Sequence, residues 1–263
     1  MRVQANLYPG GKTRALTMSY DDGRDHDRRL VEIFNRNGIK GTFHLNSSRL
    51  GLDHYVTAEE VATLYVGHEV SVHTLTHPFL ELTTTEELVW EVMEDRRNLE
   101  ALVGYPVRGM SYPYGTWNQK VVDQLRALGI VYSRTTQPTN NFITPDNFLT
   151  WHPTCKHTGG IMTKLEAFRT RRWPGSLFYV WGHSFEFAND NNWDLIEDFC
   201  AAAGGDEDTW YATNIEIYDY VMAQRALTLS ADRTMAYNPS AVSVWLSVDK
   251  TPVECKPGVV TKF

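Results

Sequence analysis

The stretch Thr17–Gly23, Thr-Met-Ser-Tyr-Asp-Asp-Gly, decides the fold that we expect for this chain. It overlaps an apolar run, Ala15–Met18, which predicts a short buried strand. Adjacent side chains at a strand end point in different directions, so Asp22 could bind a metal ion while Asp21 faces a reacting water molecule. Gly23 then allows a sharp turn. The alternative is that these residues only form a turn after a strand.

A second constellation favours the metal-binding interpretation. The residues His73-Thr-Leu-Thr-His77 follow another predicted strand, Glu69–Val72. Two histidines at this spacing can reach one ion, and imidazole suits zinc and its neighbours. Asp22 would complete a His-His-Asp set that leaves positions open for water and substrate. A lone histidine pair is usually a surface feature, so the prediction depends on both motifs together.

A metal ion in this place would polarise a carbonyl group and lower the pKa of its bound water. Asp21 could then accept the proton of that water. His183 follows the apolar strand-like segment Ser176–Trp181 and is the best candidate for the acid, because imidazole titrates near neutrality. The alternative is a core histidine that is satisfied by the backbone.

Strand-like and helix-like segments alternate up to Leu227, which predicts a parallel sheet or barrel. At the carboxyl-terminal rim of a β/α barrel, catalytic residues gather. A segment with three prolines, residues 137–157, is predicted to be a long irregular excursion. The predicted strands are Ala15–Ser19, Gly41–Leu45, Glu69–Val72, Gly109–Tyr112, Ile130–Arg134, Ser176–Trp181 and Trp210–Ala212.

After Leu227 the composition changes. Residues 228–263 are rich in Val, Thr and Ser and contain several turn signals. They predict a small antiparallel β appendage of about three strands. We therefore expect two units, a barrel over residues 1–227 and the appendage over 228–263. The appendage either covers an edge or end of the barrel or contributes to binding of a substrate or partner.

Composition limits the classes of partner. The chain has 263 residues and a formal net charge of -7, which argues against nucleic acid or an anionic membrane as the main partner. No apolar span approaches the roughly 20 residues of a transmembrane helix. The three cysteines are far apart and predict reduced thiols. The segment Met1–Lys12 lacks a signal-peptide pattern, so we expect a cytoplasmic protein if the chain is complete and an extracellular one if a signal was removed. The oligomeric state stays open.

Four motifs, in this order along the chain, resemble those of the polysaccharide deacetylase family, also described as the NodB-homology or carbohydrate esterase 4 group. This resemblance covers about residues 14–225. It implies an α/β fold, a distorted (β/α)7-type barrel, here with the small C-terminal antiparallel β appendage. It also implies one divalent metal ion, usually zinc, with cobalt, nickel and manganese as alternatives. The motifs are Ser19-Tyr-Asp-Asp-Gly23, His73-Thr-Leu-Thr-His77, Tyr112-Pro-Tyr-Gly115 and Tyr179-Val-Trp-Gly-His183.

The resemblance also implies roles for individual residues. Asp21 is similar to the catalytic base and His183 to the acid. Tyr114 occupies the place of the residue whose backbone N–H helps to stabilise the oxyanion. The expected metal ligands are Asp22, His73 and His77.

The chain departs from the family at two places. An arginine that holds the base aspartate in many members is replaced by Ser111, and Arg108 is either a substitute from another direction or a surface charge. The aspartate that orients the acid histidine has no convincing match within Tyr132–Gln137. Orientation of His183 could come instead from Glu186, Asp190 or Asp146.

Aromatic residues near the predicted loops could stack on sugar rings. We expect Tyr112, Trp151 and Trp193 as candidates for substrate binding, although most aromatic side chains simply belong to the core. Glu186 could bind sugar hydroxyls or be an ordinary charged loop residue.

Three functions are open at this stage. The first is a metal-dependent hydrolase that removes acetyl groups from an N-acetylated carbohydrate. The second is a related metal-dependent amidase that cuts a C–N bond of a small molecule. The third is a non-catalytic carbohydrate-binding descendant, against which the intact Asp21 and His183 argue.

Overall fold

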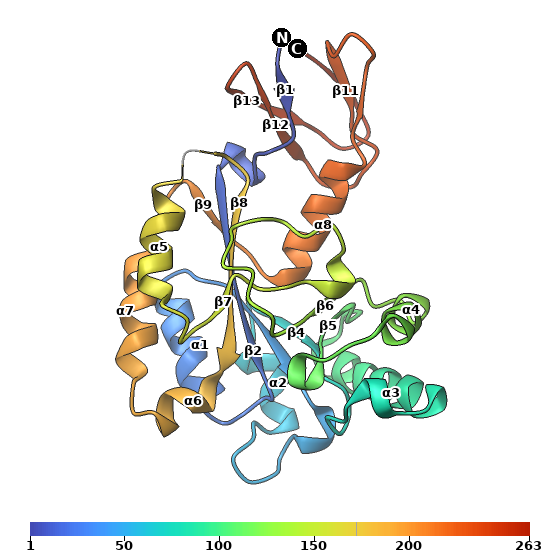
Figure 1. The fold of residues 1–263 in the computed structure, drawn as a ribbon, viewed down its shortest axis with the longest axis vertical. Coiled ribbons are helices and arrows are strands. Elements are labelled where there is room, and N and C mark those ends of the chain that lie inside the picture. The colour runs from blue at the N-terminus through green and yellow to red at the C-terminus, as the bar shows by residue number, and fades with distance from the viewer. Residues whose placement is uncertain (172) are drawn as a thin grey trace.

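A computed structural model describes residues 1–171 and 173–263 (Figure 1). Its centre is a sheet in which every strand pairing is parallel. The strand order is β6-β5-β4-β3-β2-β8-β7, and β9 also pairs with β2. The bounds are β2 (Arg14–Asp21), β3 (Gly41–Leu45), β4 (Glu69–Val72), β5 (Gly109–Ser111), β6 (Tyr132–Arg134), β7 (Cys155–Lys156), β8 (Ser176–His183) and β9 (Thr209–Tyr211).

The two ends of this sheet are joined by residues 151–156. Trp151 forms a parallel bridge with Arg134 at the end of β6, and its backbone N–H donates to the carbonyl oxygen of Ser133 at 3.0 Å. A few residues later, β7 pairs with β8. The sheet is therefore curled into a distorted barrel, which confirms the predicted α/β fold class. The prediction of an irregular stretch over residues 137–157 is wrong in part, because this stretch contains β7 and a 3-10 turn, η5 (Phe148–Thr150).

Helices follow most of the strands and pack outside the sheet (Figure 1). Three of the described helices begin with Thr–Glu capping boxes, Thr57 with Glu60, Thr84 with Glu87, and Thr213 with Glu216. The helices are α1 (Asp27–Arg36), α2 (Ala58–Leu64), α3 (Thr85–Val103), α4 (Gln119–Ala127), α5 (Ile161–Arg169), α6 (Ser184–Asn189), α7 (Trp193–Ala203) and α8 (Asn214–Arg225).

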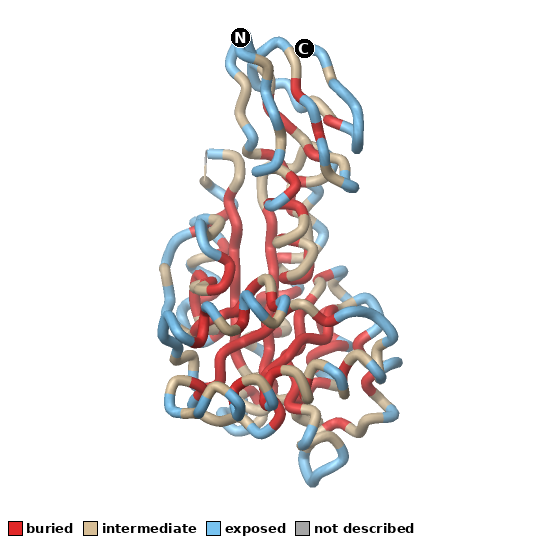
Figure 2. Tube along the Cα trace, turned by 90° about the vertical axis from the view of Figure 1, so that its right-hand side faces the viewer, coloured by how far each residue is buried: buried red, intermediate tan, exposed pale blue. Residues whose placement is uncertain are grey.

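The core lies between the sheet and these helices, and Figure 2 shows the central strands as the most buried part of the chain. All three cysteines are free and buried. Inside the barrel, polar side chains satisfy one another. Asn214 at the start of α8 accepts a hydrogen bond from Thr17 at 2.8 Å and donates one to Tyr179 at 2.6 Å. The barrel interior therefore holds the first turn of α8 in place.

The appendage contains more strands than the sequence predicted. Residues 228–263 form five strands in two antiparallel sheets, not three strands. One sheet has the order β10-β11-β14, and the other has the order β1-β12-β13. The N-terminal strand β1 pairs with β12 in the second sheet. A division of the chain at residue 227 would place these two paired strands in different units, and the two-unit division stays a prediction. The bounds are β1 (Val3–Gln4), β10 (Thr228–Leu229), β11 (Met235–Tyr237), β12 (Val244–Val248), β13 (Thr251–Cys255) and β14 (Val260–Lys262).

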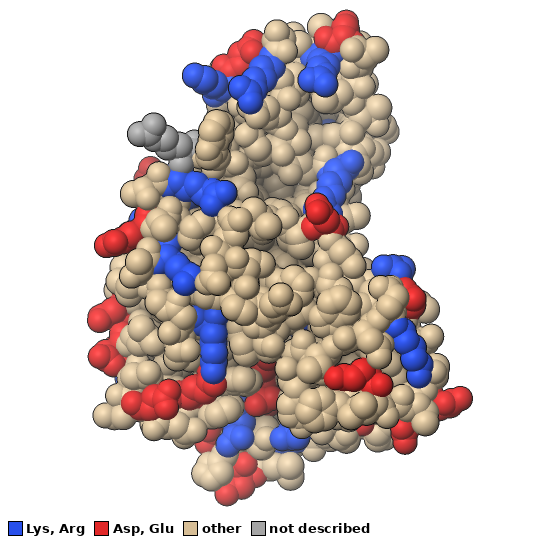
Figure 3. Space-filling view, in the orientation of Figure 1, with Lys and Arg blue, Asp and Glu red and all other residues tan. Residues whose placement is uncertain are grey.

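Figure 1 places the appendage and both termini at the end of the barrel opposite to the carboxyl ends of β2 and β8. The face in Figure 3 carries basic and acidic side chains in mixed positions around a broad uncharged band. Among the described residues, none of the helices is long and apolar enough to span a membrane.

Candidate metal and catalytic site

The end of β2 forms the centre of the site. Asp21 is the last residue of β2 and lies in register with His44 on β3 and with His183 on β8. The chain then turns at once, because Asp22 and Gly23 both have positive φ angles, of 82° and 67°. A side chain at Gly23 would approach Leu45 to 3.0 Å, so the turn requires a glycine there.

The loop after β4 presents the two histidines of the second motif. His77 has a φ of 67° and Thr74 a φ of 66°, which is a strained value for a β-branched residue. The side chain of Asn46 donates to the carbonyl oxygens of His73 and Thr74 at 2.6 and 2.8 Å. The carboxylate of Glu91 accepts from the backbone N–H of Thr76 at 2.8 Å. The surrounding structure therefore holds a strained loop in one conformation, as is common at functional sites.

These turns bring the three expected metal ligands together. One ligand atom from each of Asp22, His73 and His77 lies within 4.8 Å of the other two. The Nε2 atoms of His73 and His77 lie 3.6 and 3.9 Å from Oδ1 of Asp22. The three donors thus converge on a common point, although they come from loops about 50 residues apart in the sequence.

The ring of His73 is oriented by Ser111, the last residue of β5. Nδ1 of His73 lies 2.9 Å from the carbonyl oxygen of Ser111 and 2.7 Å from its hydroxyl. A carbonyl oxygen can only accept, so Nδ1 carries the proton and Nε2 presents its lone pair toward Asp22. The backbone N–H of His73 donates to the buried carboxylate of Asp95 at 3.1 Å. The contacts with Ser111 fix the imidazole ring, and the contact with Asp95 fixes the backbone of His73.

Asp21 is buried and is held from two directions. The hydroxyl of Ser111 donates to its Oδ1 at 3.1 Å, and the guanidinium of Arg134, at the end of β6, donates to its Oδ2. Burial alone would raise the pKa of the Asp21 carboxyl, but the charge of Arg134 outweighs it, and the pKa lies well below its ordinary value. Asp21 is therefore ionised at neutral pH.

Of the two alternatives for Arg108, the contacts fit the surface charge, and Arg134 is the arginine that binds Asp21. The guanidinium of Arg108 binds Asp219 on α8 at 2.6 and 3.0 Å, on the surface of the molecule. Arg134 is fully buried, and its guanidinium carbon lies 4.6 Å from the ring centroid of Trp181. The residue that neutralises Asp21 thus comes from the strand after the motif, not from the motif itself.

The carboxylate of Glu186 places a negative charge beside His183. Its carboxylate lies 3.3 Å from Nδ1 of His183, 3.2 Å from Nε2 of His157 and 2.6 Å from Nζ of Lys156. Burial lowers the pKa of His183, but the contact of its Nδ1 with the accepting carboxylate of Glu186 and the charge of Asp21 outweigh it, so the net pKa is raised. Of the three carboxylates that the sequence offered for orienting His183, the structure places Glu186 against it. The expectation that Glu186 is free to bind sugar hydroxyls finds no support in these contacts.

Tyr114 lies on the rim of the site in a turn after β5, with a φ of 58°. Its ring centroid is 4.5 Å from that of His77 and 3.8 Å from that of Phe79. The sequence pointed to the backbone of Tyr114, but it gave no indication of the exposed ring beside it. With Asp22, Thr74 and His77, Tyr114 is one of four non-glycine residues with positive φ around this centre.

The other aromatic candidates behave differently. Tyr112 and Trp151 are each 1% exposed, so the expectation that they bind substrate is wrong. The hydroxyl of Tyr112 donates to the carbonyl oxygen of Leu149 at 2.7 Å, and the ring of Trp151 packs against Tyr179 inside the barrel. Trp193 is partly buried at the start of α7, and Arg29 lies 4.4 Å from its ring centroid.

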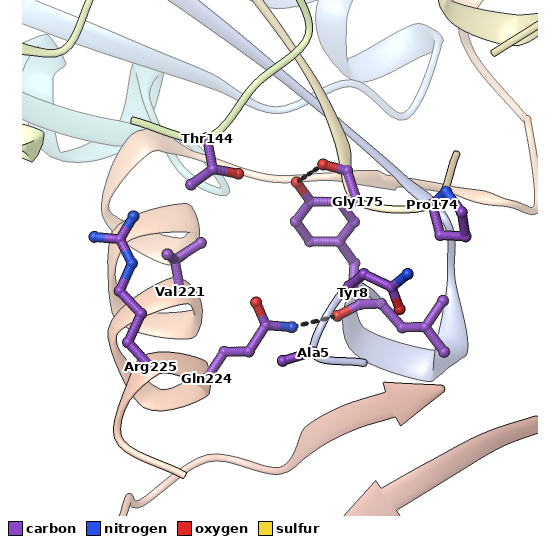
Figure 4. Close-up of a pocket in the computed structure, with 10 residues that line it drawn as sticks. Ala5, Tyr8, Thr144, Pro174, Gly175, Val221, Gln224 and Arg225 are labelled. Atoms are coloured by element: carbon purple, nitrogen blue, oxygen red, sulfur yellow. Dashed lines mark hydrogen bonds between the residues drawn. The ribbon is translucent and has the colours of Figure 1, made fainter. Parts of the chain in front are cut away.

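A cavity of about 320 Å³ lies elsewhere, between the N-terminal segment and α8 (Figure 4). The hydroxyl of Tyr8 donates to the carbonyl oxygen of Gly175 at 3.3 Å, and the side chain of Gln224 donates to that of Leu7 at 3.1 Å. None of the candidate metal ligands or catalytic residues lines this cavity. It therefore belongs to the contact between the barrel and the N-terminal segment.

Sequence reasoning missed Arg134 and Phe79. Arg134 ends the predicted strand Ile130–Arg134, and the rule that selected Asp21, His73 and His183 at strand ends would have selected it too. Phe79 follows His77 by two residues, but no rule of spacing says that its ring is exposed beside Tyr114.

Comparisons with known proteins agree with this fold. A family model for polysaccharide deacetylases matches residues 9–133. Chitin deacetylase 1 of Cryptococcus neoformans is 29% identical over 160 residues, which is 58% of this chain and 32% of that protein. A chitooligosaccharide deacetylase of Bradyrhizobium is 27% identical over 123 residues, which is 46% of this chain and 55% of that protein.

A putative polysaccharide deacetylase from Mycobacterium smegmatis has a similar fold, with a TM-score of 0.65 and 18% identity over 84% of this chain and 94% of that chain. The fold and the ordered motifs define a β/α barrel with a candidate metal centre at its carboxyl-terminal rim. The chain is thus similar to the polysaccharide deacetylase family, whose model matches just under half of its length.

Proposed function

We propose that this protein is a metal-dependent hydrolase that removes acetyl groups from an N-acetylated carbohydrate. The observation that carries the proposal is the convergence of Asp22, His73 and His77 beside the buried carboxylate of Asp21. The chitin and chitooligosaccharide deacetylases named above support the substrate class. Because the chain spans only 32% and 55% of those two proteins, their activity is transferred here as a proposal.

The donor set fits one divalent ion. Two imidazole nitrogens and one carboxylate oxygen are the ligands that zinc takes in catalytic sites, where three protein ligands leave room for water and substrate. The Nδ1–H of His73 is used by Ser111, so its Nε2 is available as a ligand. We propose zinc, with cobalt, nickel and manganese as alternatives. Such an ion supplies a positive charge that polarises the acetyl carbonyl and makes water more acidic.

The protein supplies the base. Asp21 is ionised, and its Oδ2 lies 3.9 Å from Nε2 of His73, so it faces the same space as the proposed ligands. Arg134 and Ser111 fix the direction of its carboxylate. We assign to Asp21 the removal of a proton from the attacking water.

The protein also supplies the acid and an oxyanion donor. His183 lies beside Asp21 on the neighbouring strand, and Glu186 favours its protonated form. It would donate its proton to the amine nitrogen when the C–N bond breaks. The backbone N–H of Tyr114 would donate a hydrogen bond to the oxygen that becomes negative during the attack.

Metal analysis combined with an acetate-release assay tests the proposal. The Asp21→Asn variant is expected to keep about one bound ion per chain and to lose about 10²–10⁴-fold in turnover. The His73→Ala, His77→Ala double variant is expected to lose the ion. His54→Ala, which removes an exposed histidine outside the centre, is the matched control and should change neither quantity.

Two results would contradict the proposal. Full metal content in the double histidine variant would refute the assignment of His73 and His77 as metal ligands. Unchanged turnover in Asp21→Asn would refute the assignment of Asp21 as the base.

A further inference from the structure

Two large aromatic side chains are exposed and stacked at the rim of the candidate site. Phe79 is 40% exposed and Tyr114 is 52% exposed. Their ring centroids lie 3.8 Å apart, and their planes differ by 11°. They come from different loops, since Phe79 follows β4 and Tyr114 follows β5. Their contact is therefore a product of the tertiary structure.

This aromatic pair begins directly at the proposed metal centre. The ring of Tyr114 meets the imidazole of His77 edge-on, with a centroid distance of 4.5 Å and an interplanar angle of 73°. Along this row the order is His77, Tyr114 and then Phe79. The exposed ring of Phe79 is thus one ring farther from the candidate metal ligands than that of Tyr114.

The backbone holds the pair in place. Tyr114 has a φ of 58°, a conformation that non-glycine residues rarely adopt. The next residue, Gly115, has a φ of 74°, and a side chain there would meet the Oγ1 atom of Thr136 at 2.1 Å. Strained conformations persist where the surrounding structure enforces them, which happens most often at ligand sites.

The chemistry of the pair favours a sugar ring as its ligand. Two aromatic rings in contact with water lack the favourable free energy of burial, and a ligand that covers them would provide it. A pyranose has a face of C–H groups that packs against an aromatic ring, while its hydroxyls stay in water. Phe79 is the outer ring of the pair, because Tyr114 lies between it and His77. Its position therefore suits the sugar unit adjacent to the one that is deacetylated.

We propose that Phe79 and Tyr114 form a subsite for the sugar unit next to the acetylated unit. This inference rests on the proposed deacetylase function. It adds Phe79 as a residue that determines which substrates are used.

The test is a chain-length series with the zinc-loaded protein. Acetate release is measured with N-acetylglucosamine oligomers of one to four units and with glycan strands from peptidoglycan. The wild type is expected to show a kcat/KM that rises at least about ten-fold from one unit to three. Phe79→Ala should lose most of this rise through a higher KM, whereas Phe79→Tyr, which keeps a ring, should retain it. Leu82→Ala is the matched control, because Leu82 is 80% exposed on the same segment.

An equal chain-length dependence in Phe79→Ala and wild type would overturn the subsite. Calorimetric titration with the same oligosaccharides separates this failure from failure of the proposed function. If the wild type binds oligosaccharides without releasing acetate, and Phe79→Ala weakens that binding about ten-fold, the result supports the subsite and refutes the deacetylase function. If the wild type neither binds nor hydrolyses any member of the series, the subsite is refuted.

Discussion

The buried ion pair between Arg134 and Asp21 allows a quantitative prediction. Arg134 is 0% exposed and the side chain of Asp21 is 3% exposed. The Arg134→Met variant keeps a similar volume but leaves the carboxylate in the barrel with Ser111 as its neutral donor. Removing one partner of a buried pair costs about 3–5 kcal/mol, because the other charge stays buried and uncompensated. We expect Arg134→Met to lose stability in this range.

A double-mutant cycle isolates the pair from other effects of the substitution. Urea unfolding is followed by tryptophan fluorescence in the presence of a chelator, so that metal binding does not contribute. The Asp21→Asn, Arg134→Met double variant is expected to be more stable than the sum of the single effects predicts, by about 2–3 kcal/mol. If Arg134→Met does not fold, Arg134→Lys keeps the charge and should fold with a smaller loss.

The surface pair of Arg108 with Asp219 provides the control. Both side chains are partly exposed, at 36% and 42%, so Arg108→Met should cost about 0–1 kcal/mol. Additive effects in the Arg134 cycle, within about 0.5 kcal/mol, would refute the buried pair. An equal loss in Arg108→Met and Arg134→Met would refute the argument from burial.

Three further predictions concern other parts of the structure. Glu186→Gln should lower the pKa of His183, because the contact of its Nδ1 with the accepting carboxylate of Glu186 is the main one that raises this pKa. An unchanged NMR titration of that imidazole would contradict the assignment. Burial raises the pKa of Glu69 from 4.5 to about 7, so the stability that its proton contributes is present below pH 4.5 and is lost as the pH rises through 7. Relative to Glu69→Gln, the wild type should lose about 3 kcal/mol of unfolding free energy over this interval. Parallel pH profiles of the unfolding free energy in the two proteins would exclude this. Gly182→Ala would place a methyl group 2.0 Å from Nδ1 of His157, so the ring of His157 must move. We expect the unfolding free energy to fall by about 1–3 kcal/mol, measured by thermal or urea unfolding. Unchanged stability would show that the ring has room for the methyl group.

The strands and helices of the barrel could be predicted because their signals are local. The apolar run of β8 acts within one strand, and the structure has this strand where the sequence predicted it; the capping box of Thr84 with Glu87 is a signal of the same local kind. The two-residue strand β7 and the number of strands in the appendage were not predicted correctly, because short strands are defined mainly by the strands with which they pair.

The sequence by itself determined the parts of the site that lie within single motifs, the Asp21-Asp22 pair and the two histidines of residues 73–77. Only the tertiary structure decided which groups surround them. Arg134 reaches Asp21 across 113 residues, and Phe79 meets Tyr114 from another loop. The physical reason is that a parallel barrel brings the carboxyl ends of strands distant in sequence to one rim, and no local pattern encodes which side chains meet there.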